Sequence, residues 1–137
     1  MKETEIFLHE NHKRSLTSTL IVVEQLLNDI EELMKKPYNT CCYKIEYDID
    51  DESVNHNLKI IEESRSLICT LHDKYNTEKR VQSLQRIIDT KKTKIWEILH
   101  DSKSRRMKGF GEFPQKFIKD YDKDIDDLMA ISEKLTF

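Results

Sequence analysis

The chain is poor in the residues that interrupt helices, since its 137 residues include only two glycines and two prolines. Turns depend on glycine and proline, so this shortage argues against a β-rich chain that must reverse direction every few residues. Charged residues make up 36% of the sequence, which is typical of long solvent-exposed helices. A chain of this length can bury a hydrophobic core, and we expect one domain over residues 1–137.

Long apolar runs are also missing. No run approaches the roughly 20 residues that cross a bilayer, and the first residues lack the apolar stretch of a secretory signal. The three cysteines are an odd number, and two of them are adjacent at positions 41 and 42. We therefore expect a reduced, cytoplasmic protein without a membrane partner.

The chain lacks a strong excess of charge of either sign. A formal net charge of −3 is too small to indicate a nucleic-acid or membrane partner by itself. The distribution is uneven, with ten basic and four acidic residues in 77–108 but three basic and eight acidic residues in 45–75. Two oppositely charged helices packed side by side account for this pattern, so we expect no nucleic-acid partner.

What the chain does have is apolar residues at helical spacing, most extensively from Lys2 to Lys36. Steps of three and four place them on one stripe, formed by Ile6, Leu16, Leu20, Val23, Leu27, Ile30 and Met34. A helix over these residues would be roughly 50 Å long and would end before Pro37. Such a stripe requires partner helices to cover it.

The rest of the sequence predicts three further helices. The second starts at an N-cap Asp50 or Asp51 and carries a stripe of Val54, Leu58, Ile61, Ile68, Leu71 and Tyr75. The third carries Val81, Leu84, Ile88, Ile95 and Leu99 and ends with a basic run before Gly109. The fourth starts at Pro114 and carries Phe117, Tyr121, Ile125, Leu128, Ser132 and Leu135.

No glycine or proline separates the second helix from the third, so one continuous helix is an alternative. The two stripes differ in direction by roughly 120°, which favours a tight hairpin with a left-handed Asn76 and a capping Thr77. The predicted fold is an all-α, antiparallel up-down-up-down four-helix bundle with a long first helix and a long first connection. The first helix would exceed the second and fourth by about ten residues, so its N-terminal end would project or contact another subunit.

The connection over residues 37–50 alternates apolar and charged residues, which is the period of a β-strand. Its apolar members are Tyr43, Ile45, Tyr47 and Ile49. One interpretation is a loop that lays its aromatic side chains over one end of the bundle. The other is an edge that pairs with its own copy in a dimer.

The best candidate for a chemical site is a set of histidines. Glu5, His9 and His12 follow helical spacing, and His72 falls at the same end of an antiparallel bundle. Three imidazoles and a carboxylate are suitable ligands for Zn, Fe or Mn. The paired Glu-x-x-His helices of di-iron bundles are absent, so the alternative is a group of half-exposed polar residues at a helix end.

Two weaker patterns also involve His72. Cys69 and His72 are spaced as zinc ligands on neighbouring helical turns, and Cys41 and Cys42 lie in the first connection. Arg65 and His72 form an Arg-x6-His string that resembles the short motif of HEPN-type helical ribonucleases. This resemblance implies an arginine that binds phosphate and a histidine that transfers a proton.

No nucleophile, base and acid occur together in the sequence, so an enzyme is not favoured. We expect a non-enzymatic helical bundle that acts through protein–protein contact as an adaptor, regulator or assembly subunit, and that forms a homodimer. The first alternative is a metal-binding bundle, either a metalloenzyme or a protein that binds the metal without catalysis. The second is an RNA-binding or ribonuclease bundle of the HEPN type.

Overall fold

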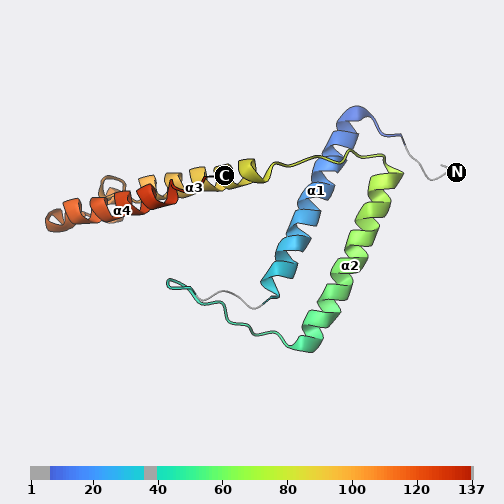
Figure 1. The fold of residues 1–137 in the computed structure, drawn as a ribbon, viewed down its shortest axis with the longest axis horizontal. Helices are drawn as coiled ribbons and strands as arrows, with labels where there is room; N and C mark the ends of the chain where they lie inside the picture. Colours follow the sequence, from blue (N-terminus) through green and yellow to red (C-terminus); the bar gives the residue numbers. More distant parts are fainter. Residues whose placement is uncertain (1–6, 36–39, 137) are drawn as a thin grey trace. The chain divides into compact units, whose positions relative to one another are not determined.

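The computed structural model describes residues 7–35 and 40–136, and every regular element in these ranges is a helix. The α-helices are α1 (Glu10–Leu33), α2 (Asp51–Lys74), α3 (Leu84–Asp101) and α4 (Ile118–Ser132). Two 3-10 helices, η1 (Ser104–Phe110) and η2 (Gln115–Phe117), lie between α3 and α4. The predicted all-α class is confirmed for this part of the chain (Figure 1). The helices belong to two compact units, Met1–Lys79 and Arg80–Phe137.

The first unit is an antiparallel hairpin of α1 and α2 (Figure 1). The helix α1 begins later than predicted, because Nδ1 of His9 accepts a hydrogen bond of 3.3 Å from the N–H of Asn11 and so caps the helix. Residues 7–9 are not helical, and residues 2–6 and 36 lie outside the described part. Since α1 and α2 both have 24 residues, the predicted excess of α1 over α2 is wrong.

The start of α2 is confirmed. The Asp50 carboxylate accepts a hydrogen bond of 2.7 Å from the Ser53 N–H, and this bond lowers the pKa of Asp50. The predicted stripe of α2 is the side that packs: Ile61 is only 4% exposed, and the other members are half-buried. On α1 the half-buried apolar residues include Leu16, Leu20, Leu27 and Met34, whereas Val23 and Ile30 of the predicted stripe are exposed.

The end of α2 is partly as predicted. Asn76 has a φ of 51°, which confirms the left-handed conformation after the helix. Thr77 does not cap the next helix, because its N–H donates to the His72 carbonyl at 3.1 Å and its side chain is also engaged. The helix α3 instead begins after Ser83, whose hydroxyl accepts from the Arg86 N–H. The predicted tight turn is therefore wrong, and Val81 is 97% exposed in the connection instead of lying on a helical stripe.

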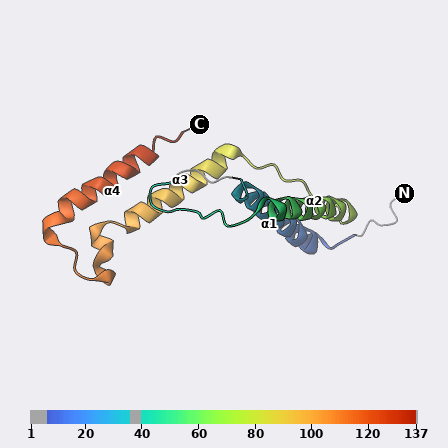
Figure 2. The ribbon, with the colours of Figure 1, turned by 90° about the horizontal axis from the view of Figure 1, so that it is seen from below.

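The second unit pairs α3 with α4, and Figure 2 shows η1 and η2 closing the turn between them. The helix α3 ends at Asp101, and the basic run at 103–108, which was predicted to end this helix, lies in η1 and at its N-cap Lys103 instead. Pro114 precedes η2 rather than starting α4. Gly109, which was predicted to follow the end of the third helix, lies within η1. Gly111 follows η1 with a φ of 117°, a conformation that favours glycine.

The polar contacts of Ser104 explain why α3 stops early. The buried Ser104 donates from its N–H and its hydroxyl to the Asp122 carboxylate, at 2.9 and 2.8 Å. Nζ of Lys103 lies 2.6 Å from the Asp126 carboxylate, and the Tyr121 hydroxyl donates to the Ser102 carbonyl at 2.5 Å. These bonds from α4 direct the chain away from the axis of α3.

Candidate functional site

The predicted metal ligands are distributed over the end of the first hairpin. The N-terminal end of α1 and the C-terminal end of α2 lie together, so His9, His12 and His72 occur at the same end, as expected (Figure 1). His9 precedes α1 instead of lying on its stripe, and its ring centroid is 6.0 Å from that of His12. Glu5 lies outside the described residues.

His72 already has a partner within α2 and its C-terminal turn. Its Nδ1 lies 2.6 Å from the hydroxyl oxygen of the buried Thr77. Among the residues that the structure describes, no three or more His, Cys, Asp and Glu side chains form a group that could hold a metal ion. The four-residue site, which includes Glu5, stays a prediction.

The cysteines are all exposed free thiols. Cys41 and Cys42 lie in the segment before α2, and Cys69 lies on α2 itself. Neither pair of residues singled out by the sequence, Cys69 with His72 or Cys41 with Cys42, belongs to a metal-holding group in the described part of the chain.

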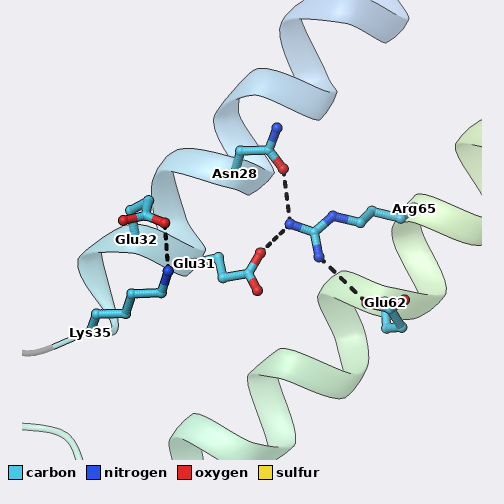
Figure 3. A network of polar contacts seen from close by, with 6 residues as sticks. All are labelled: Asn28, Glu31, Glu32, Lys35, Glu62 and Arg65. Atoms are coloured by element: carbon cyan, nitrogen blue, oxygen red, sulfur yellow. Dashed lines mark hydrogen bonds and ion pairs between the residues drawn. The ribbon is translucent and has the colours of Figure 1, made fainter.

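Arg65 of the HEPN-like string is engaged in contacts between the two helices (Figure 3). Its Nη2 donates to Oδ1 of Asn28 at 2.9 Å and forms an ion pair with Glu31, both from α1. Its Nη1 lies 3.4 Å from the Glu62 carboxylate on α2. The hydrogen bond from Arg65 lowers the pKa of Glu31, and the same bond raises the pKa of Arg65.

Sequence reasoning missed this polar network. The only signal in the sequence is an arginine among the apolar residues of the α2 stripe, between Ile61 and Ile68. Its partners on α1 are 34 and 37 positions away, so they could be identified only from the register of the hairpin. The network fixes that register, because Arg65 has to lie level with residues 28–31 of α1.

Each hairpin also leaves one apolar face uncovered. On the first hairpin we call this the first apolar face, and its side chains are between 40% and 63% exposed. Its members are Val22, Val23, Leu26, Ile30 and Leu33 of α1 with Ile60 and Leu67 of α2. An α-helix turns by 100° per residue. On this basis the exposed apolar residues of α1 lie roughly 110° around the helix from its packed side, and those of α2 lie at the same angle with the same direction of rotation. Because the helices are antiparallel, both rows point to the same side of the hairpin.

The second hairpin repeats this arrangement. Its second apolar face consists of Leu84, Ile87 and Ile98 of α3 with Leu128 and Ile131 of α4, all of them exposed. The exposed rows of α3 and α4 are rotated by roughly 90° from their packed sides, again in the same sense, so they share one side. The sequence contained this signal only in part, since Ile87, Ile98 and Ile131 lie outside the predicted stripes, whereas Leu84 and Leu128 were predicted as members of the stripes and are exposed.

One open depression lies on the second hairpin. It has a volume of about 400 Å³ and is lined by Asp89, Lys92, Thr93, Trp96 and Glu133. Nζ of Lys92 donates to the Glu133 carbonyl at 3.1 Å, and Trp96 stacks on His100 with ring centroids 4.8 Å apart. Its lining provides no nucleophile paired with a base.

Comparison with known proteins does not assign the chain to a family. It matches no protein-family model, and the searches of curated proteins and of solved structures gave no significant match. Within the described residues, none of the helices is long and apolar enough to cross a membrane.

Proposed function

We propose that this protein is a non-enzymatic helical-bundle protein that acts through protein–protein contact, as an adaptor, a regulator or an assembly subunit. The observation that supports this proposal most directly is the exposed apolar face of each hairpin. Seven aliphatic side chains that are about half exposed leave roughly 600–700 Å² on the first face, at or above the largest patch on typical monomers. Covering such a face, either by the other hairpin or by another protein, removes apolar surface from water and is therefore favourable.

We propose further that the two hairpins complete an antiparallel up-down-up-down four-helix bundle and thus a single domain. A layer of two helices with one free apolar face is the unit from which such bundles are built. Residues 1–79 carry ten basic and sixteen acidic side chains, whereas residues 80–137 carry thirteen and ten, giving net charges of −6 and +3. Opposite charges favour the first hairpin packing on the second over packing on its own kind.

We also propose that the protein forms a homodimer. The expected N-terminal overhang does not support this proposal, because α1 starts only at Glu10 and Ile6 lies outside the described residues. The support comes from the segment 43–49, whose apolar side chains are exposed beside the first hairpin. A two-fold dimer can bury such a segment against its own copy.

Two neighbouring positions on α2 test whether the first apolar face is covered. Leu67 belongs to this face, whereas the adjacent Ser66 is exposed on the far side of the same helix. We expect Leu67→Asp to lower the free energy of unfolding in urea by about 2 kcal/mol or more, because a charge would be buried without a partner. Ser66→Asp, which adds the same charge one residue away, should cost less than about 0.5 kcal/mol. Equal small effects would show that the face is exposed to water in the folded protein, which would refute the closed four-helix bundle and leave the face accessible to a partner protein.

A further inference from the structure

The segment between α1 and α2 presents a regular alternation of side chains. Tyr43, Ile45, Tyr47 and Ile49 alternate with three charged residues, Lys44, Glu46 and Asp48. In a β-strand successive side chains point to opposite faces, so in a strand over residues 43–49 the apolar residues would share one face and the charged residues the other. All four apolar side chains remain exposed, by 38% to 62%.

The backbone of this segment is also available. Within the described residues, positions 43–49 form no strand and take part in no backbone–backbone hydrogen bond. The segment is nevertheless attached to the hairpin, because the Tyr47 hydroxyl donates to the Met34 carbonyl at the end of α1. The Tyr43 carbonyl accepts a hydrogen bond from the Thr40 hydroxyl. An anchored segment whose N–H and C=O groups make no backbone–backbone hydrogen bond in the described part of the chain is a template for another strand.

We propose that this segment pairs with the same segment of a second copy as an antiparallel ladder whose two-fold axis passes through Ile45. This inference rests on the proposed homodimer and assigns its interface. In this register Ile45 faces its own copy, Lys44 faces Glu46, and Tyr43 faces Tyr47. The two-fold axis repeats each of the last two pairs, which gives two opposite-charge pairs on one face and two aromatic pairs on the other.

The charges of the segment select this register over its neighbours. An axis through Glu46 would place two glutamates directly opposite each other, and an axis through Lys44 would do the same with two lysines. An axis through Tyr47 would place Glu46 opposite Asp48 twice. A slip by one residue would place apolar side chains opposite charged ones. The axis through Glu46 also pairs Lys44 with Asp48, but it keeps the two glutamates opposite each other. Only the axis through Ile45 gives opposite-charge pairs without a like-charge pair, and this self-complementarity indicates a second copy as the partner.

Charge reversal of the full-length protein tests the ladder. Lys44→Glu and Glu46→Lys each create two like-charge pairs in the dimer, whereas the double variant restores both opposite-charge pairs. We expect each single reversal to raise the dimer dissociation constant at least tenfold in sedimentation equilibrium, and the double variant to return it to near the wild-type value. Lys59→Glu, an exposed charge reversal on α2, is the matched control and should leave dissociation unchanged.

A second measurement tests the position of the axis independently of charge. In a Cys41→Ser/Cys42→Ser/Cys69→Ser background, which removes all three exposed free thiols, Ile45→Cys would place a thiol opposite its own copy, within the distance that a disulfide spans. Oxidised glutathione should therefore convert the Ile45→Cys variant to a covalent dimer. In the Ile49→Cys variant, residue 49 would face position 41 of the other copy and would have no thiol opposite it. This variant should therefore not form a covalent dimer.

The outcomes separate this inference from the homodimer on which it rests. A wild-type mass of 16.4 kDa at all concentrations would refute the homodimer and the ladder together. If the wild type has a mass of about 33 kDa and neither single charge reversal lowers it, the homodimer would be supported and the ladder refuted. Failure of the double variant to restore dimerisation would also refute it, provided that its helical circular dichroism equals that of the wild type.

Discussion

At the scale of single residues, the role of Arg65 follows from its contacts with the neighbouring helix. It occupies a position on the packed side of α2, and its guanidinium reaches Asn28 and Glu31 on α1 (Figure 3). Directional bonds between helices restrict sliding in a way that aliphatic contacts do not. The arginine that resembled part of a ribonuclease motif is thus a link between two helices in this structure.

Removal of this link should weaken the first hairpin. We expect Arg65→Ala and Glu31→Ala each to lower the melting temperature, and the double variant to lower it by less than the sum, because the two side chains act as a pair. Lys59→Ala, on the same helix, should leave the melting temperature unchanged. Additive effects in thermal unfolding would contradict a direct interaction between Arg65 and Glu31.

Three carboxylates make the free energy of unfolding depend on pH in the acidic range. Hydrogen bonds lower the pKa of Glu31, Asp50 and Asp122 below the ordinary values of 4.5, 3.8 and 3.8. A carboxyl whose pKa is lower in the folded state stabilises the protein above its unfolded pKa, and this contribution is lost as the pH falls through the folded pKa. We expect the urea midpoint to fall as the pH drops below about 4.5. Asp122→Asn should reduce that fall, and an unchanged acid dependence in this variant would exclude Asp122 as a cause.

The histidines allow a direct test of the metal interpretation. If Glu5, His9, His12 and His72 hold a metal, untagged protein should contain substoichiometric Zn, Fe or Mn by elemental analysis. The His9→Ala/His72→Ala variant should lose it, and added metal should raise the melting temperature of the wild type only, since a ligand of the native state stabilises it. The site would be excluded if the purified protein contained no metal and its melting temperature did not change when Zn, Fe or Mn was added.

At the scale of helices, the ends were harder to predict than the helices themselves. Asp50 has a capping side chain directly before a long apolar stripe, and its role is confirmed. Thr77 and Ser83 are both good capping residues, the first before the predicted third stripe and the second between its members Val81 and Leu84. The contact of Thr77 with His72 occupies the threonine, so α3 begins after Ser83.

The seam between α1 and α2 provides the test of the stripe assignment. Ile61 is the buried hydrophobic residue of the described part of the chain, so Ile61→Ala should cost about 2–5 kcal/mol. Leu27→Ala, at a half-buried position that the sequence placed in the core, should cost less, and Lys59→Ala should cost almost nothing. Urea unfolding measures all three. Equal losses in the free energy of unfolding for Ile61→Ala and Lys59→Ala would show that the packed side of α2 has been assigned wrongly.

At the scale of the whole molecule, the described structure consists of two helical hairpins that each pack along one seam and expose one apolar face. The number of helices and their approximate positions follow from apolar periodicity, because a stripe at steps of three and four is a local property of the chain. The side of each stripe that packs within its own hairpin does not follow, because apolar residues extend around a wider arc than one partner helix covers. Val23 and Ile30 were thus assigned to the same stripe as Leu27, and only the hairpin separates them.

The sequence by itself determined the helical class, the four main helices, the cap at Asp50 and the left-handed Asn76, because each depends on residues a few positions apart. Only the tertiary structure decided the early end of α3 and the partners of Arg65, whereas the start of α1 is set by the local cap of His9 on Asn11, which the sequence reasoning missed. The end of α3 depends on bonds from Ser104 to Asp122, and the place of Arg65 depends on side chains more than thirty positions away. Such contacts are set by which helix faces lie together, and that choice is a property of the folded chain.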